Sequence, residues 1–198
     1  MTTRNQKHIQ ALLDLASAGE QSEGMTWYSR ANLAATRLAD QYEIAIDTAA
    51  GVIAALSPRN KWDRNLVDAE NLIAAFKAGG DEAAADVKVC TFGANKKKAI
   101  EILTWGAIGD IVKELLSGPK LIEFFSCIIG EDDVCIDGHA YSIWFGDRIT
   151  LNKIPSIGKK LRAEIKKDYL AVAKKNNLKG YEVQAITWVA HRRIHGVN

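Results

Sequence analysis

Two apolar stretches joined by a short acidic connection, between Leu116 and Phe145, constrain the fold of this chain more than any other feature. Ser117-Gly118-Pro119-Lys120 is a helix-start signal, because serine caps free amides and proline is tolerated in a first helical turn. The apolar run that follows ends at Gly130 and three acidic residues. Asp137-Gly138-His139 then opens a second, aromatic-rich helix. We therefore expect a lysine and an aspartate at the starts of two successive helices.

The remaining periodicity also predicts helices, and it predicts no sheet. Asp47 is expected to cap one short apolar helix, and Gly79-Gly80 to stop the helix after it. We expect helices at residues 6–18, 25–42, 47–56, 62–77, from 93 onward, and at 108–116, 139–146 and 181–195. The fold class predicted from this pattern is all-α.

Composition describes an ordinary globular chain. Hydrophobic residues make up 47% and charged residues 25% of the 198 positions, and no apolar run approaches membrane-spanning length. Because the polar N-terminus is no secretion signal, we expect a cytoplasmic monomer that does not enter a membrane. Cys90, Cys127 and Cys135 are interpreted as reduced core thiols, so no metal and no cofactor are expected.

The net charge of +2 hides an uneven distribution. Residues 151–198 carry eleven Lys and Arg against three acids, which leaves 15 Lys and Arg against 21 acids for residues 1–150. A basic C-terminal quarter fits a phosphate-binding lobe, and a solvated helix face accounts for it equally well.

A second Gly-x-Lys stretch, Gly158-Lys159-Lys160, offers Lys160 as a rival to Lys120. It follows Asp137 instead of preceding it. The apolar stripe of the helix that it opens, which leaves Lys160 on the solvent side, is formed by Ile157, Leu161, Ile165, Tyr169 and Val172. We therefore favour Lys120 as the functional lysine.

The order Gly118-Pro119-Lys120, Gly130 and Asp137-Gly138-His139 resembles the signature of the helix-hairpin-helix base-excision DNA glycosylases, the superfamily of endonuclease III and the oxoguanine glycosylases. The chain departs from the family hairpin at Leu116, which stands where its first glycine would be. The cysteine-held iron–sulfur cluster of some members is not expected, because no cysteine follows Cys135.

This resemblance implies an endonuclease III-like, two-lobed helical bundle that binds double-stranded DNA. The lobe that carries the hairpin would span residues 26–134, and residues 1–25 with 135–198 would form the second, basic lobe. It also implies that the backbone at Ser117 and Gly118 holds a DNA phosphate. Lys160 would add to the DNA-binding charge of the basic lobe.

The chemistry that the resemblance implies uses Lys120 and Asp137. A base must leave the duplex before its glycosidic bond can be broken, and the bond's cleavage places positive charge on the sugar. Asp137 would stabilise that charge, and Lys120, once desolvated, would attack C1′ and form a Schiff base. His139 would cap the helix or orient its neighbours.

Two further segments resemble the family more loosely. In Leu56-Ser57-Pro58-Arg59-Asn60, either Arg59 or Asn60 would fill the gap left by an extruded base, and a plain helix-capping loop is an equal alternative. Lys96 lies in a lysine-rich helix start and is interpreted as either a DNA contact or part of a solvated face.

Three functions follow as expectations. The first is a DNA glycosylase with possible AP-lyase activity that acts on a damaged or modified base. The second is a transferase of the phage type that modifies a hypermodified thymine through the same flipped-base chemistry. The third is a non-catalytic DNA-binding helix-hairpin-helix module.

Overall fold

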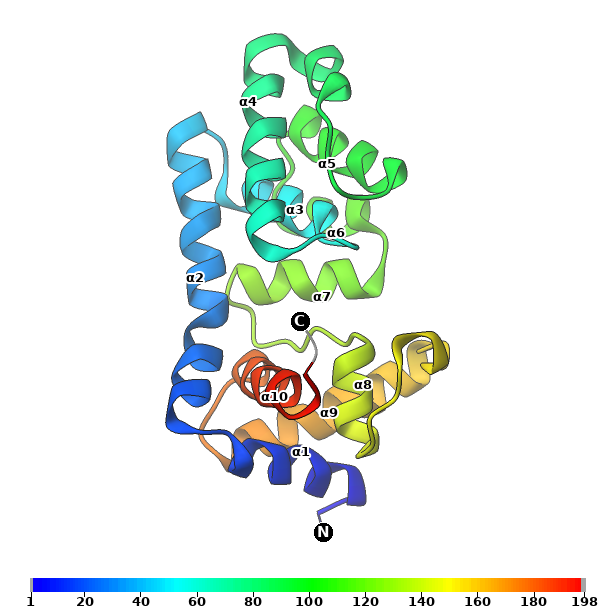
Figure 1. The fold of residues 1–198 in the computed structure, drawn as a ribbon. Helices are drawn as coiled ribbons and strands as arrows, with labels where there is room; N and C mark the ends of the chain where they lie inside the picture. Colours follow the sequence, from blue (N-terminus) through cyan, green and yellow to red (C-terminus); the bar gives the residue numbers. More distant parts are fainter. Residues whose placement is uncertain (1, 197–198) are drawn as a thin grey trace. The chain divides into compact units, whose positions relative to one another are not determined.

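The computed structural model of the chain describes residues 2–196, and within that range it contains helices and no strand (Figure 1). The predicted all-α class is confirmed. The helices group into two compact units: unit 1 comprises residues 1–30 and 130–198, and unit 2 comprises residues 31–129. The boundaries expected from the sequence, at 26 and 134, lie nearby, and the status of the units as domains stays a prediction. No helix between residues 2 and 196 combines the length and the apolar character needed to cross a membrane.

Unit 2 is built around a short helix that is buried along nearly its whole length. Its helices are the second part of α2 (Ala18–Tyr42), then α3 (Ile46–Leu56), α4 (Trp62–Asp86), α5 (Gly93–Trp105), α6 (Asp110–Leu116) and α7 (Pro119–Ile128). Every residue of α3 from Thr48 to Leu56 is buried. A Cβ atom at Gly51 would lie 2.6 Å from Cγ1 of Val112, so the glycine permits close packing. The short apolar helix expected at residues 47–56 is confirmed.

One of two local expectations for unit 2 needs correction. Asp47 does not cap α3, because the N-cap is Ala45 and Asp47 lies in the first turn. Its carboxylate instead accepts a hydrogen bond of 2.8 Å from the amide of Gly109, which ties α3 to the loop before α6. Gly79 and Gly80 break the helical backbone as expected, and a short helix follows them and continues to Asp86.

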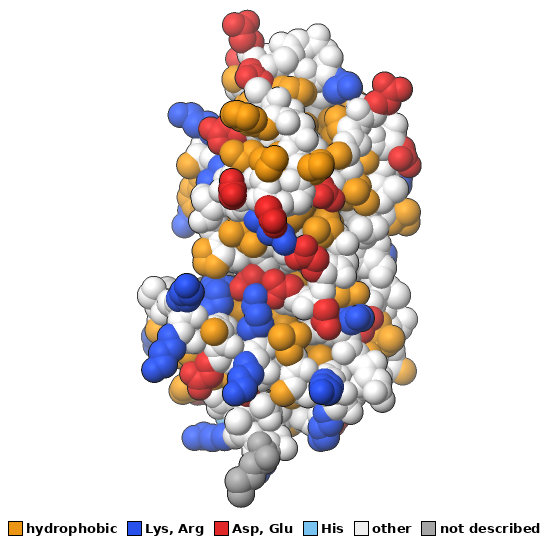
Figure 2. Space-filling view, turned by 180° about the vertical axis from the view of Figure 1, so that it is seen from behind, with side chains coloured by type: hydrophobic (Ala, Val, Ile, Leu, Met, Phe, Trp, Pro, Cys, Tyr) orange, Lys and Arg blue, Asp and Glu red, His pale blue; other side chains and the backbone are white. Residues whose placement is uncertain are grey.

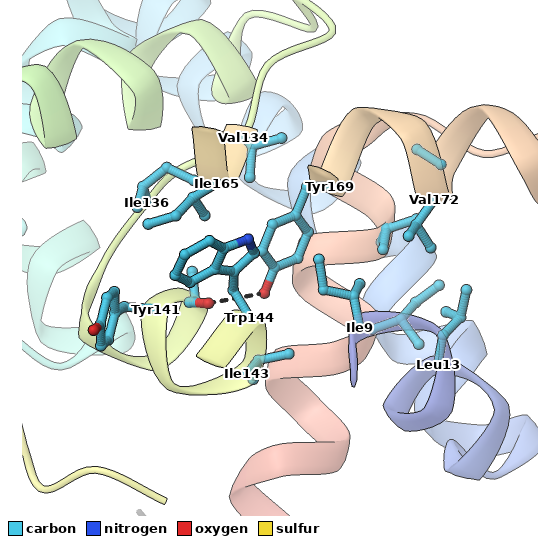
Figure 3. Close-up of a cluster of buried hydrophobic side chains, with 14 of the residues drawn as sticks. Ile9, Leu13, Val134, Ile136, Tyr141, Ile143, Trp144, Ile165, Tyr169 and Val172 are labelled. Atoms are coloured by element: carbon cyan, nitrogen blue, oxygen red, sulfur yellow. Dashed lines mark hydrogen bonds between the residues drawn. The ribbon is translucent and has the colours of Figure 1, made fainter. Parts of the chain in front are cut away.

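Unit 1 buries one apolar core among its helices. These are α1 (Arg4–Leu15), the first part of α2, α8 (Gly138–Phe145), the 3-10 helix η1 (Leu151–Lys153), α9 (Lys159–Lys175) and α10 (Gly180–His195). Figure 3 shows Trp144 of α8 in the middle of this core, beside Tyr169 of α9. Ile165 and Tyr169 are fully buried, which confirms the apolar stripe predicted for α9.

A buried carboxylate joins three helices of unit 1. Asp168 of α9 accepts a 2.8 Å hydrogen bond from the indole of Trp144 and a 2.7 Å bond from the side chain of Gln6. The hydroxyl of Thr3, which also caps α1, donates a third bond of 3.3 Å. Because Asp168 is only 5% exposed, these donors supply the hydrogen bonds that burial removes from the carboxylate. The position of α8 therefore depends on Asp168.

Helices α2 and α10 approach closely at a glycine. A Cβ atom at Gly24 would lie 2.4 Å from Cα of Ile186 and 2.5 Å from its nitrogen. One turn farther along α2, the hydroxyl of Tyr28 donates a 3.1 Å hydrogen bond to Gln184 of α10. Only a residue without a side chain allows the two backbones to meet at this distance.

Gly24→Ala is therefore expected to destabilise unit 1. The added methyl group meets backbone atoms, which cannot rotate away, so we expect the free energy of unfolding to fall by roughly 1–3 kcal/mol. Gly19→Ala is the matched control, because it lies in the same helix with no atom within 4 Å of the added Cβ. It should leave stability unchanged or raise it by up to about 1 kcal/mol. Urea unfolding measures both, and an unaffected Gly24→Ala variant would contradict the close approach.

Candidate functional site

The stretch predicted to form the hairpin is a two-residue connection between α6 and α7. Helix α6 ends at Leu116, Ser117 adopts the left-handed conformation with φ of 51°, and Gly118 is the N-cap of α7. Pro119 occupies the first turn of α7, as the sequence predicts. Ser117 was expected to cap α7, but it ends α6 instead.

Lys98, which the sequence did not single out, braces this connection. Its amine donates hydrogen bonds of 2.6 Å to the carbonyl of Leu116 and 2.8 Å to the hydroxyl of Ser117. A cation at the C-terminal end of a helix satisfies carbonyls that have no partner within the helix. Lys98 therefore holds the end of α6 and, through it, the start of the hairpin turn.

The backbone conformation of the turn does not require a glycine at position 118. Its φ of −117° and ψ of 129° suit any residue. A Cβ atom there would have only ordinary contacts, at 3.8 Å from the Leu116 carbonyl and 4.0 Å from Leu121. A glycine that the fold does not need is consistent with a backbone that something outside the chain approaches closely.

The two rival lysines lie in similar local positions. Lys120 is in the first turn of α7 and Lys160 in the first turn of α9, and both are exposed. Only the three-residue helix η1 and a loop precede α9, so the second Gly-x-Lys stretch forms no helix–turn–helix of the α6–α7 kind. This difference favours Lys120 as the lysine of a hairpin.

The loop after α3 divides the roles of its two candidate residues. Arg59 is exposed, has φ of 57°, and its guanidinium lies 4.9 Å from the ring centre of Phe92. Asn60 faces inward and donates a 2.9 Å hydrogen bond to the buried carboxylate of Asp68. Asn60 therefore braces the loop, whereas a role for Arg59 in filling a base gap stays a prediction.

Asp68 gathers the donors that hold this loop. Its carboxylate accepts bonds from Arg64 at 2.6 Å and from the amide of Cys90 at 2.7 Å, besides the bond from Asn60. Burial alone raises the pKa of Asp68, but these hydrogen bonds outweigh it and the pKa is lowered. Cys90 itself is exposed, which corrects its interpretation as a core thiol, whereas Cys127 and Cys135 are buried as expected.

Lys96 has a structural role. Its amine donates hydrogen bonds to the carbonyls of Ala85 and Val87, which belong to the C-terminal end of α4. The lysine therefore caps α4, as Lys98 caps α6. The sequence proposed a DNA contact or a solvated position, and neither accounts for these bonds.

Asp137 and His139 lie where the sequence predicts, at the start of α8. Asp137 is the N-cap, and its carboxylate accepts a 2.9 Å hydrogen bond from the amide of Ala140. Asp137 belongs to unit 1 and Lys120 to unit 2. Their joint action therefore stays a prediction.

Three histidines of unit 1 form a cluster beside Asp137. The ring centres of His139 and His191 lie 5.8 Å apart, and those of His191 and His195 lie 4.4 Å apart, in both cases edge to face. We call these three residues the histidine cluster. The rings come from α8 and α10, and Arg148 and Asp137 lie within electrostatic range of His191. The chain has four histidines, and His8 is the one outside the cluster.

Burial and charge act together on His191. Burial, followed by the neighbouring His195, His139 and Arg148, lowers the pKa of His191 to about 4, and the negative charge of Asp137 opposes them. No hydrogen bond contributes to this shift. His191 is therefore a buried, neutral imidazole at pH 7 whose protonation the surrounding groups oppose.

Asp137 also influences a buried tyrosine. Burial raises the pKa of Tyr169, and the charge of Asp137 adds to that effect. The Tyr169 hydroxyl donates a 3.2 Å hydrogen bond to the carbonyl of Ala140, drawn as a dashed line in Figure 3. The N-terminal turn of α8 is thus held from the core side by Tyr169.

A cavity of about 300 Å³ opens on another face of unit 1. Its lining residues are Arg4, Asn5, Tyr141, Trp144, Phe145 and Leu161. The rings of Tyr141 and Phe145 are nearly parallel, with an interplanar angle of 14°. Trp144, which is buried in the core of unit 1, also contributes to the lining of this cavity.

The sequence did not identify the histidine cluster as a site. The spacing of His191 and His195 places both on one face of α10, but their neighbour His139 lies more than fifty positions earlier in the chain. Among the described residues no group of three or more His, Cys, Asp or Glu side chains is arranged to hold a metal ion. The cluster therefore has to be explained through its hydrogen-bonding and charge properties.

Stability is expected to fall at mildly acidic pH because of His191. Its pKa is about 4 in the folded chain and about 6.5 when unfolded, so its contribution is complete above pH 6.5 and is lost as the pH falls towards 4. The loss should reach up to about 3 kcal/mol, measured by urea unfolding between pH 7.5 and 4. His191→Gln should flatten this slope and His8→Gln should retain it. Equal slopes in both variants would assign the effect elsewhere.

Comparison with known proteins gives a family and no function. No curated protein and no solved structure matches the chain. One family model does match, and it covers residues 1–195. The chain accordingly belongs to the family of unknown function DUF7178.

Proposed function

We propose that the chain is a DNA glycosylase of the endonuclease III-like, helix-hairpin-helix type that acts on a damaged or modified base in duplex DNA. The observation that carries the proposal is the connection between α6 and α7, with Gly118 before Pro119 and Lys120 in the first turn. In chain order this hairpin is followed by Asp137 as the N-cap of α8. The same order of elements underlies the resemblance found in the sequence.

The hairpin would serve as the phosphate-binding element. No side chain caps the N-terminus of α7, whose positive end of the helix dipole favours an anion. Gly118 leaves the backbone of the turn accessible, since the surrounding structure leaves space at its Cα. A phosphate would then meet backbone amides and not a charged side chain.

Unit 1 supplies positive charge for the same partner. It contains 15 Lys and Arg against 11 acids, whereas unit 2 contains 11 against 13. In Figure 2 several Lys and Arg side chains lie on the face of unit 1 that is seen from behind. The exposed lysines of α9 are Lys159, Lys160, Lys167, Lys174 and Lys175. Charge of this kind attracts a phosphate backbone without regard to sequence.

Asp137 would stabilise the positive charge that develops on the sugar as the base leaves. Its hydrogen bond from Ala140 and its place at a helix N-terminus both favour the anionic form. Preorganised charge of this kind is a large term in many enzymes. Lys120 would attack C1′ with its amine, displace the base and form a Schiff base that leads to β-elimination.

Because Lys120 is exposed, we keep a second candidate function, a base-modifying transferase. Lysine nucleophiles act from desolvated sites, and Lys120 is exposed, so bound substrate would have to supply the desolvation. A transferase that modifies a hypermodified thymine would flip the same base without breaking the sugar bond. Analysis of the nucleosides after reaction separates the two, because a glycosylase yields free base and a transferase an altered nucleoside.

Gly118→Ala should weaken DNA binding and leave stability unchanged. The space at Gly118 predicts a change in unfolding free energy within about 0.5 kcal/mol. A methyl group on the turn would keep a phosphate from the backbone, so we expect affinity for a short duplex to fall about tenfold. Fluorescence anisotropy at fixed salt measures the affinity. Gly93→Ala, also with open space at its Cα, is the control that should bind normally.

The reaction itself is tested with duplexes that contain a panel of base lesions or an abasic site. Wild-type protein should release a base and, with borohydride, form a covalent adduct on abasic-site DNA. Asp137→Asn should lose base release while keeping its fold, because asparagine caps a helix as well as aspartate does. Lys120→Ala should lose the adduct.

Lys160→Ala is the matched control for the adduct, since Lys160 is also exposed in a first helical turn two residues after a glycine. Loss of the adduct in Lys160→Ala and not in Lys120→Ala would assign the nucleophile to Lys160. If the protein binds duplex DNA normally but alters none of the lesion-containing duplexes, the chain would be a non-catalytic DNA-binding module.

A further inference from the structure

The histidine cluster concentrates groups that prefer the same kind of ligand. His139, His191 and His195 meet with ring centres 4.4–5.8 Å apart, and the guanidinium of Arg148 acts on His191 from the loop after α8. Each neutral imidazole carries one N–H donor, and arginine carries five. Asp137 is the opposing charge, and its carboxylate already accepts a bond from the Ala140 amide.

His191 is the most buried residue of this cluster. The residue is only 5% exposed, but its ring nitrogens are not among the described buried side-chain atoms that lack a hydrogen-bond partner. The ring therefore lies at the core side of the cluster without being sealed off as an unsatisfied buried group. His139 and His195 are half-buried and Arg148 is exposed, so the groups run from the core of unit 1 to solvent.

Neighbouring groups also oppose protonation of His191. Besides burial, the charges of His195, His139 and Arg148 lower the pKa of His191, and the nearby carboxylate of Asp137 compensates for only part of this. A bound anion would reverse the balance, because it attracts each of these groups at once. Polar clusters with strongly perturbed protonation are common at functional sites.

We propose that His139, His191, His195 and Arg148 bind a phosphate group. Arg148 and the outer imidazoles contact the phosphate oxygens, and His191 donates from the buried side. The phosphate belongs to a nucleic-acid backbone or to a small phosphorylated molecule. This site does not depend on base release or on Lys120, so it stands or falls separately from the glycosylase proposal.

The four histidines make the test selective. We titrate the protein with inorganic phosphate at constant ionic strength and follow the imidazole ¹⁵N resonances by long-range ¹H–¹⁵N NMR. The resonances of the histidine cluster should shift with saturation, and those of His8 should stay fixed. The pKa of His191 should rise from about 4 in the presence of phosphate.

Arg148→Gln is the test variant, because Arg148 is exposed and its replacement should not disturb folding. We expect it to weaken phosphate binding about tenfold or more, since it removes a charge-assisted bond. Lys153→Gln, which changes another exposed cation at the end of η1, should bind as wild type.

The source of the phosphate is separated by two further titrations, one with a short duplex and one with a nucleoside monophosphate. Shifts of the histidine cluster with the duplex indicate a backbone phosphate, and shifts with the monophosphate alone indicate a small ligand. Resonances that do not move with any of the three ligands, or that move equally with chloride, would overturn the proposal.

Discussion

The hydrogen bonds of the buried Asp168 carboxylate determine where α8 lies, and the site of unit 1 depends on α8. Trp144, Gln6 and Thr3 bring donors from α8 and from the start of α1 to one acceptor on α9. A buried carboxylate is tolerated only when such donors replace water. Removing one partner would leave either a buried charge or a buried indole N–H unsatisfied, and each is costly. The fixed position of α8 in turn fixes Asp137, His139 and the wall of the aromatic-lined cavity.

Sequence patterns predicted the features that depend on near neighbours. The apolar run of α3, the stripe of α9 and the break at Gly79-Gly80 follow from periodicity and from glycine conformations, which act within a few residues. The start of α8 at Asp137 followed from the capping preference of aspartate. These local rules were sufficient for the all-α class and for most helix ends.

The expectations that failed involve partners distant in the chain. Asp47 was expected to cap its own helix, but its carboxylate binds the amide of Gly109. Ser117 was expected to start α7, whereas Lys98 binds it at the end of α6. A capping preference says which residues can satisfy a helix end, but it does not say which distant donor or acceptor competes for them. The histidine cluster escaped detection for the same reason, since α8 and α10 meet only in the folded unit.

We have proposed anion binding at three kinds of surface, and each has a different physical signature. The lysines of α9 are exposed point charges, so binding through them weakens steeply as the salt concentration rises, because the release of counterions then contributes less free energy. The hairpin at Gly118 presents backbone amides without a nearby cap, so its contribution depends on geometry more than on ionic strength. The histidine cluster contains titratable rings, so its contribution increases as the pH falls towards the folded pKa of His191, which is about 4.

These signatures allow the surfaces to be told apart in one binding measurement. Binding that depends on salt alone would come from the lysines, and binding that depends on pH would involve the histidine cluster. A component that persists at high salt, does not change with pH and is lost in Gly118→Ala would belong to the hairpin. Charge neutralisation depends on salt concentration, whereas hydrogen bonding to backbone amides depends mainly on geometry. Phosphate binding measured as a function of salt and pH therefore distinguishes three sites, whereas the composition of the chain shows only a basic protein.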